Sequence, residues 1–152
     1  ETPNLTWLLL TKRIGNVIKM TEPARGNPVL PRNAAIGATL PNQFEYDRDR
    51  MKLHEVKERL DPAYTFRSFE PLLGPVILDK FAPDWIITGG ETDQGQHKAR
   101  DADPAWFRSL MRQSSELGRA FFMKQMTRKA PIPGDLLVRQ WPVVNSRERT
   151  PA

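Results

Sequence analysis

Short apolar runs recur along the chain, and most of them are continuous instead of alternating. They are rich in β-branched and aromatic residues and cover positions 6–11, 35–40, 64–69, 85–88 and 120–124. Continuous runs of this length are typical of strands buried on both faces of a parallel sheet. Roughly 15 to 30 residues separate successive runs, which suits a crossover helix and is too long for a hairpin.

A helix is predicted over residues 47–60, between the second and third runs. Its apolar residues recur at helical spacing on one face; they are Leu53, Val56 and Leu60, with Met51 beside them. Weaker patterns predict a short helix over residues 14–20 and at most one helical turn over residues 78–81.

A second clear helix is predicted between the fourth and fifth runs. Asp103 and Pro104 have the order of an N-cap followed by a first-turn proline, and Gly118 stands where a glycine commonly ends a helix. The apolar stripe between them consists of Trp106, Leu110 and Leu117.

Strands and helices therefore alternate, and right-handed crossovers arrange them as a curved parallel sheet with helices outside. We predict an α/β fold in which residues 1–152 form a single domain, a partial (β/α) TIM-like barrel of about five strands. Five strands cannot close an eight-stranded barrel, so two open edges are expected. Residues 131–152 are expected to form an extended tail that packs on the barrel through Leu136, Leu137, Val138 and Trp141.

Composition narrows the class of protein. Apolar residues make up 39% of the chain and charged residues 27%, as in globular proteins. No apolar run is long enough to span a bilayer, and the chain has no cysteine for a disulfide or an iron–sulfur cluster of its own. A cytoplasmic location fits this composition. The net charge of +5 is compatible with nucleic acid as a partner, but acidic residues lie near many basic ones, which favours an ordinary solvated surface.

Polar or glycine residues follow each predicted strand. They are Thr11, Lys12 and Arg13; Thr39, Asn42 and Gln43; Ser68 and Glu70; Gly89, Gly90 and Glu91; and Lys124 and Gln125. Chemistry in parallel α/β proteins collects at the carboxyl ends of the strands, so this rim is the candidate site. The alternative is that the charges pair with one another across a polar barrel mouth.

The residue types limit what such a rim can do. Lys12, Arg13 and Lys124 suit a carboxylate or phosphate group. Glu70 and Glu91 can bind an amino group or ribose hydroxyls, act as acid or base, or bind a hard cation. The two glycines, Gly89 and Gly90, let a ligand approach the backbone closely.

Histidines and tryptophans add little to this picture. His97 lies in a polar, glycine-containing loop and is a better functional candidate than His54, which lies among helix charges. One histidine beside Glu91 and Asp93 is a poor metal site, so no metal is assigned. The tryptophans predicted to pack in the core or against helices are Trp7, Trp85 and Trp106.

At these strand ends the sequence resembles a phage-associated protein family, found in phages and prophages, that is similar to radical S-adenosylmethionine barrels. The segments that carry the resemblance are TWLLLTKRIGNVIKM, AAIGATLPNQFEYDRDRMKL, FRSFEPLLGPVIL, DWIITGGETD, the AR of HKARDADPAWFRSL, FFMKQM and IPGDLLVRQWP. They occur in the family's order and cover nearly the whole chain.

The resemblance implies that this chain is the C-terminal half of a barrel. An upstream half would carry a three-cysteine motif for a [4Fe–4S] cluster, at which relatives bind the methionine end of S-adenosylmethionine. It also implies a site that contains the rim residues named above together with Arg100. Glu70, Glu91 and Lys124 are the catalytic candidates, and the others are candidates for binding substrate or cofactor.

Two segments depart from the family's pattern. A segment that usually ends in Thr-Val-Glu-Asn-Gln reads Thr39-Leu40-Pro41-Asn42-Gln43, and the loop after GGE reads Thr92-Asp93-Gln94-Gly95. The GGE itself lies on a late strand, so it is not equated with the early segment that holds the cofactor's amino group in many radical enzymes.

The resulting hypothesis is the substrate-side half of a radical-S-adenosylmethionine-like enzyme, inactive alone and with an unknown reaction. The alternative is a non-catalytic binding module, or a split half-barrel, that acts with a partner chain at its open edges or with a nucleic acid or nucleotide-like substrate.

Overall fold

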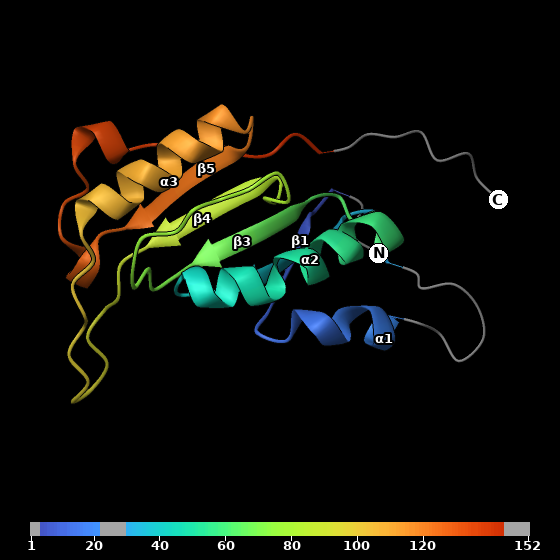
Figure 1. The fold of residues 1–152 in the computed structure, drawn as a ribbon, viewed down its shortest axis with the longest axis horizontal. Coiled ribbons are helices and arrows are strands. Elements are labelled where there is room, and N and C mark those ends of the chain that lie inside the picture. Colours follow the sequence, from blue (N-terminus) through green and yellow to red (C-terminus); the bar gives the residue numbers. More distant parts are fainter. Residues whose placement is uncertain (1–3, 22–29, 145–152) are drawn as a thin grey trace.

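Five parallel strands form one open sheet in the computed structural model, which describes residues 4–21 and 30–144 (Figure 1). The strands are β1 (Trp7–Thr11), β2 (Ala34–Thr39), β3 (Thr65–Phe69), β4 (Trp85–Gly89) and β5 (Ala120–Gln125). They lie in chain order, and each runs parallel to its neighbour. The predicted α/β fold is confirmed, as an open sheet that does not close into a barrel.

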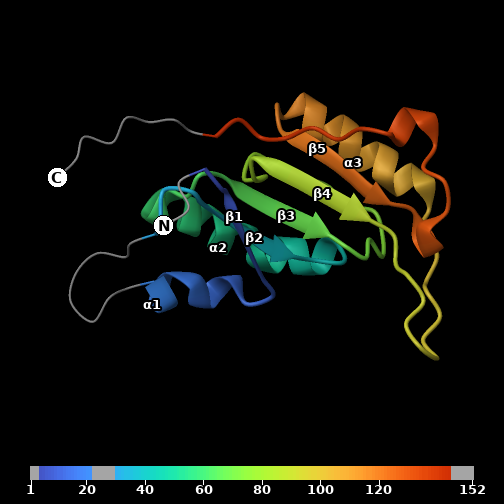
Figure 2. The same cartoon turned by 180° about the vertical axis from the view of Figure 1, so that it is seen from behind.

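The two long helices lie on the same face of this sheet (Figures 1 and 2). They are α2 (Gln43–Leu60) and α3 (Pro104–Glu116). The short α1 (Val17–Thr21) follows the 3-10 turn η1 (Ile14–Asn16), and the turns η2 (Thr127–Lys129) and η3 (Gly134–Leu136) follow β5. We call the face opposite α2 and α3 the helix-free face.

Helix α2 begins four residues earlier than the apolar pattern predicted. The Oδ1 atom of Asn42 accepts a hydrogen bond from the Glu45 N–H at 3.1 Å, which caps the helix so that it starts at Gln43. The predicted core face is confirmed; its buried residues include Leu53, Val56 and Leu60. Met51 is 47% exposed, so its predicted place beside them was wrong.

Helix α3 has the predicted caps. Asp103 accepts a hydrogen bond from the Ala105 N–H at 2.8 Å, Pro104 is the first helical residue, and Gly118 follows the helix with φ 64°. Its buried face differs from the prediction, since the buried residues are Phe107, Leu110 and Ser114. Trp106 and Leu117 are only partly buried, at the margin of the core.

The weaker helix predictions have different outcomes. Residues 14–20 are helical, as η1 and α1 together. Residues 78–81 form no helix; one turn, closed by a 2.9 Å bond from the Ala82 N–H to the Asp79 carbonyl oxygen, replaces it. Among the described residues, no helix combines the length and apolar character that a membrane crossing needs.

Aromatic side chains fill the helix-free face. Phe66, Trp85 and Phe122 lie there, and the indole of Trp141 packs on them with its ring centre 4.9 Å from that of Trp85. The ring of Phe66 lies over Gly37, where a Cβ atom would come within 2.3 Å of it. Only glycine leaves room for this ring.

The outer edge of β1 is apolar and half exposed. Between 44% and 56% of the surface of each large side chain is accessible; these are Leu5, Trp7, Leu8, Leu9 and Leu10. The prediction that Trp7 packs in the core is therefore wrong. Within the described residues, β2 is the only strand that pairs with β1.

The outer edge of β5 is covered by the chain's own tail. The Met123 N–H donates to the Val138 carbonyl oxygen at 2.8 Å, and the Gln140 N–H donates to that of Phe121 at 2.8 Å. The sheet is open, with β1 and β5 at its two edges as expected, but this segment covers part of the second edge, at residues 121–123. In the tail, Leu136 is buried and Leu137 is 61% exposed.

The tail is less uniform than predicted. It includes η3 (Gly134–Leu136) and makes one antiparallel bridge at Arg139, so it is not extended throughout. Val138 is partly buried against the core. Residues 145–152 of the predicted tail lie outside the described residues.

Candidate functional site

The predicted site residues lie along one rim, because parallel strands place their carboxyl ends at the same edge of the sheet (Figure 2). The structure separates them into two groups. One group, at the ends of β3, β4 and β5, is joined by contacts between side chains. The other group, at the ends of β1 and β2, makes no side-chain contact with the first group among the contacts of the described residues.

Glu70 and Lys124 form an ion pair across three strands. The Lys124 Nζ atom lies 2.9 Å from each carboxylate oxygen of Glu70. Glu70 follows β3, Lys124 belongs to β5, and Gly89 of β4 lies between them. A Cβ atom at Gly89 would already lie 3.5 Å from the Glu70 carboxyl carbon, so a larger side chain there would fill the space over which the pair meets.

Lys124 lies at a β-bulge near the end of β5. In the ladder between β4 and β5, Thr88 pairs with Met123 and Gly89 pairs with Gln125, so Lys124 is the extra residue. Bulges are common at strand ends and next to active sites. The two charged side chains therefore meet beside Gly89, where the ladder becomes irregular.

Gly90 is held tightly to the end of β5. Its N–H donates to the Gln125 carbonyl oxygen at 2.9 Å, and the Gln125 Nε2 atom donates to the Gly90 carbonyl oxygen at 2.9 Å. A Cβ atom at Gly90 would lie 2.2 Å from the backbone nitrogen of Thr127, so only glycine fits. The Gly90 N–H is therefore already bonded and does not face a ligand.

Glu91 begins a hairpin that projects beyond the strand ends (Figure 1) and closes through a bridge between Gln94 and His97. Arg100 donates to the Glu91 carboxylate three times, from Nη2 at 2.7 Å, Nε at 3.0 Å and its backbone N–H at 2.8 Å. His97 Nε2 lies 3.3 Å from the same group. These contacts, those of Arg100 above all, lower the pKa of Glu91 to about 2.

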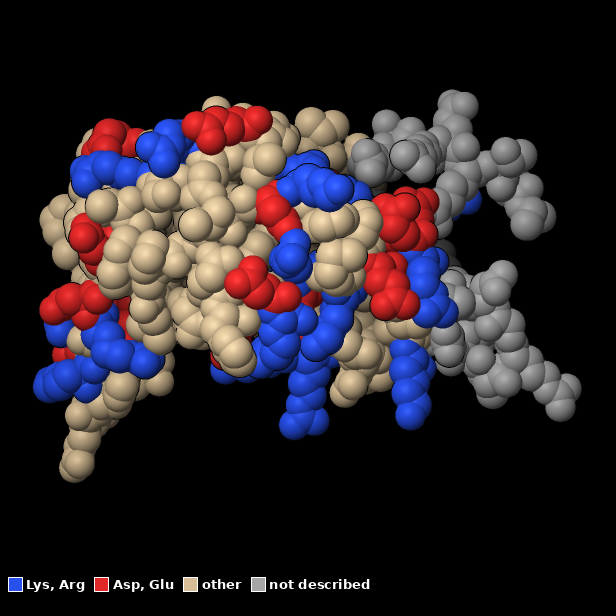
Figure 3. Space-filling view, in the orientation of Figure 1, with Lys and Arg blue, Asp and Glu red and all other residues tan. Residues whose placement is uncertain are grey.

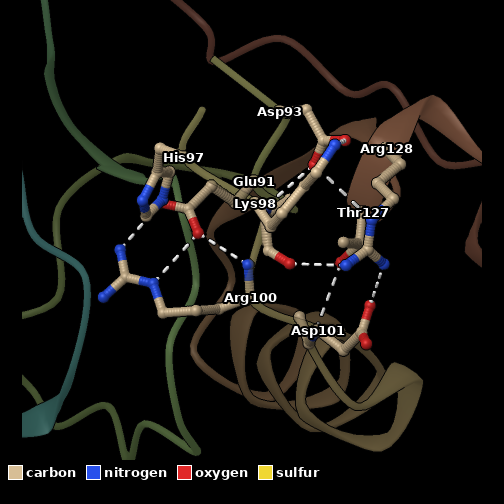
Figure 4. A network of polar contacts seen from close by, with 10 residues as sticks. Glu91, Asp93, His97, Lys98, Arg100, Asp101, Thr127 and Arg128 are labelled. Atoms are coloured by element: carbon tan, nitrogen blue, oxygen red, sulfur yellow. Dashed lines mark hydrogen bonds and ion pairs between the residues drawn. The ribbon is translucent and has the colours of Figure 1, made fainter. Parts of the chain in front are cut away.

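Arg128 fastens this hairpin to the end of β5, and sequence reasoning missed it. Its N–H donates to the Glu91 carbonyl oxygen at 2.8 Å, and its guanidinium bonds to Asp101 at 2.5 Å and to the Ala99 carbonyl oxygen at 2.6 Å (Figure 4). Arg128 and Lys129 both have positive φ, 54° and 57°, which non-glycine residues rarely adopt. No pattern in the sequence marks this turn.

The residues after β1 and β2 have mainly local contacts. Thr11 Oγ1 accepts a bond from the Arg13 N–H at 2.9 Å. Lys12 and Arg13 are exposed, and in residues 4–21 and 30–144 neither side chain has an ion-pair partner. Thr39 stands opposite Ser68 in the ladder between β2 and β3, close to the Glu70 end of the rim.

Two predicted binding residues are used by helix α2 instead. The Asn42 side chain caps the helix, and Gln43 donates to Asp47 at 2.9 Å and accepts from the Ile77 N–H at 2.6 Å. Both side chains therefore have structural partners.

The rim contains paired charges but no set of metal ligands. Across the described residues, no group of three histidine, cysteine, aspartate or glutamate side chains is placed to hold a metal ion. The chain also has no cysteine. An iron–sulfur cluster therefore does not fit on the residues present here. What the rim offers is one carboxylate and one ammonium group at Glu70 and Lys124, with the hydroxyls of Ser68 and Thr39 on neighbouring strands.

Residues 1–140 match the sequence model of DUF5131, which is described as a family of proteins of unknown function. The chain belongs to the DUF5131 family. Comparison with curated proteins and with solved structures gave no match. The DUF5131 match covers all five strands and the rim, so the site described above lies within the part that the family shares.

Proposed function

We propose that this DUF5131 chain is the substrate-side half of a phage-type, radical-S-adenosylmethionine-like barrel enzyme. The observation that carries the proposal is the Glu70–Lys124 pair, which lies beside Gly89 and the bulge of β5 at the carboxyl ends of parallel strands. Ligands of α/β barrels bind at this end. The resemblance of the segments around the pair, SFEPLLGP, GGE and FFMKQM, supports the same function.

Roles within the rim follow from the contacts. A carboxyl group with a pKa of about 2, such as that of Glu91, is a poor proton acceptor near neutral pH, so Glu91 and Arg100 order the hairpin. The side chains of Glu70 and Lys124 are 21% and 53% exposed, so a ligand can reach them, and they are the groups that we assign to substrate.

The cofactors of the proposed enzyme would not be held by this chain. Because the residues present do not fit an iron–sulfur cluster, we place the cluster and the methionine end of S-adenosylmethionine on polypeptide outside it. That polypeptide would pair with the apolar edge of β1. A cytoplasmic location belongs to the same proposal, since a chain without cysteine is compatible with a reducing compartment.

Anaerobic reconstitution with iron and sulfide tests where the cluster lies. We expect the 152-residue chain to take up no stoichiometric iron and to show no cluster absorbance, because it has no thiolate ligands. A stoichiometric [4Fe–4S] cluster on this chain would overturn the assignment. In a longer protein that contains the chain and cleaves S-adenosylmethionine, Glu70→Gln and Lys124→Ala should each reduce turnover about tenfold or more. Unchanged turnover in both variants would remove these residues from the site.

The exposed edge of β1 favours a second candidate function, a binding module that works through a partner chain. A strand with apolar side chains on both faces is built to be covered on both faces, and an open edge offers backbone groups for pairing. Light scattering of the chain at increasing concentration should show self-association, and Leu8→Lys should reduce it. A monodisperse monomer at all concentrations would remove the support for this alternative.

Within this alternative, the structure supports a protein partner better than a nucleic-acid partner. On the face that carries α2 and α3, positive and negative side chains lie interleaved (Figure 3). Several of the positive ones are paired; Arg48 and Lys52 both bond to Asp49, at 2.6 and 2.7 Å. Binding of DNA or RNA at low salt, with a steep loss as salt rises, would restore this possibility.

A further inference from the structure

The Glu70–Lys124 pair gives little stability to the fold. It lies beside Gly89 and the bulge of β5, and the side chain of Lys124 is 53% exposed. Ion pairs with such exposure contribute little to the free energy of folding, because water and salt screen them. Stability therefore does not explain why two strand ends are arranged to bring these groups together.

The two members of the pair differ in how firmly they are held. The Glu70 side chain is 21% exposed and lies against Gly89, whereas the long Lys124 side chain is about half exposed. Lys124 can rotate away while Glu70 remains in place. The ammonium group of Lys124 sits symmetrically, 2.9 Å from both carboxylate oxygens, as another ammonium group would sit if it took the same position.

The charges decide which ligand can enter. An anion that bound Lys124 alone would leave Glu70 unpaired beside a second negative charge, and a cation on Glu70 would leave Lys124 unpaired. A ligand with both charges on adjacent groups replaces each half of the pair with a new charge-assisted bond. Ser68 lies two residues before Glu70 on β3, and Thr39 stands opposite it on β2, so both hydroxyl residues belong to the same end of the rim.

We propose that the Glu70–Lys124 pair binds the zwitterionic head group of an α-amino acid, or of a larger ligand that ends in one. The ligand's ammonium group takes the place of Lys124 on the Glu70 carboxylate, and Lys124 turns to the ligand's carboxylate. The inference rests on the proposed function only in taking this rim as the substrate site, and it names the class of ligand.

The test uses the ¹⁵N-labelled 152-residue chain and the backbone amide signals of Gly89 and Gly90. Glycine and L-methionine should each produce saturable shifts of these signals. Acetate and methylammonium at the same ionic strength should not, because each supplies only one of the two charges. If either single-charge probe saturates the site as well as glycine does, or if neither amino acid saturates it, the proposal is overturned.

Variants of the two paired residues test whether the amino acid binds at the Glu70–Lys124 pair. Glu70→Gln and Lys124→Gln should each weaken the binding of glycine about tenfold or more, since each removes one charge-assisted contact. Lys98→Gln is the matched control, because Lys98 is 77% exposed and pairs with Asp93 in the hairpin. It should leave the affinity unchanged. Equal affinity in all three variants would place the binding elsewhere. Thermal melts of the variants show that they fold, and the wild-type probe series tests the proposal even if one does not.

S-adenosylmethionine carries the same head group and separates two sources of the ligand. Because the proposed function places the methionine end of the cofactor outside this chain, we expect binding equal to or weaker than that of L-methionine, which assigns the site to the substrate. Binding about tenfold tighter would assign the site to the cofactor and contradict that placement. If no zwitterion binds but a longer protein does hold a cluster, this inference fails and the proposed function stands. If amino acids bind but a cluster is found in none of the longer proteins that contain this chain, the proposed function fails and this inference stands.

Discussion

The two edge strands of the sheet, β1 and β5, differ in how far the rest of the chain covers them. On the β1 side, a strand with apolar side chains on both faces ends the sheet, and about half of the surface of each of these side chains is accessible. On the β5 side, the tail bonds to the strand, Trp141 covers its aromatic residues, and Arg128 fastens the hairpin at its end. The β5 edge is covered in part by this chain's own tail, whereas the apolar residues of β1 have the pattern of a strand inside a larger sheet.

The largest effect on stability is expected from a matched pair of alanine substitutions, one on each side of the sheet. Phe121→Ala in β5 removes a side chain that is 1% exposed and should lower the free energy of unfolding by about 3–4 kcal/mol. Leu9→Ala in β1 removes one that is 45% exposed and should cost about 1 kcal/mol or less. Urea unfolding followed by circular dichroism measures both. Equal losses would mean that β1 is covered in solution.

A smaller effect is expected from the tail. Trp141→Ala removes an indole whose ring centre lies 4.9 Å from Trp85 and 5.6 Å from Phe122, and it should lower the free energy of unfolding by about 1–2 kcal/mol. Val143→Ala, at a side chain that is 90% exposed, is the control and should change it by about 0.5 kcal/mol or less. If the two variants are equally stable, the tail does not hold the β5 side.

The smallest effect concerns the hairpin and depends on pH. The folded-state pKa of Glu91, about 2, lies below the value of about 4.3 for an unperturbed glutamate. The ionised carboxylate therefore stabilises the fold above about pH 4.3, and this contribution is lost as pH falls through 2. NMR titration should show Glu91 titrating near pH 2.

The partner residue can be checked in the same experiment. Arg100→Gln should raise the pKa of Glu91 toward its ordinary value, because it removes the guanidinium that bonds the carboxylate. Arg112→Gln, whose partner is Glu116 on α3, should leave the pKa of Glu91 where it is. A titration of Glu91 near pH 4 in the unaltered chain would show that the hairpin is not closed by Arg100 in solution.

Parallel strands and helix starts could be predicted because they depend on local patterns. Continuous apolar runs gave all five strands, and Asp103 with Pro104 gave the start of α3. The start of α2 was placed too late because Asn42 was interpreted as a site residue, although asparagine is also a strong N-cap residue.

Features that depend on distant contacts could not be predicted. Arg67 is fully buried under α2, where its Nη2 atom donates to the Asp49 carbonyl oxygen at 2.8 Å and burial lowers its pKa to about 10. An arginine within an apolar run gives no sign of this position. The tail's cover over β5 and the role of Arg128 likewise depend on residues that are far apart in the chain.

For the site, the sequence predicted which rim was polar but not which residues meet there. The pairing joins Glu70 to Lys124, 54 positions further along the chain, and the run of residues 120–124 carries no sign of this contact or of the bulge. The same reasoning also predicted Lys12 and Arg13 at the other end of the rim. Only the structure shows that Glu70 and Lys124 form a pair and that Lys12 and Arg13 lie apart from it.

The bulge at Lys124 has a consequence for how this protein can change in evolution. Up to Met123, strict alternation ties each side chain of β5 to the core or to the helix-free face. Lys124 stands outside that alternation and its side chain is 53% exposed, so its substitution can alter what the rim accepts while the hydrophobic interior stays intact. Gln125 is less free to change, because its side chain donates to the Gly90 carbonyl oxygen.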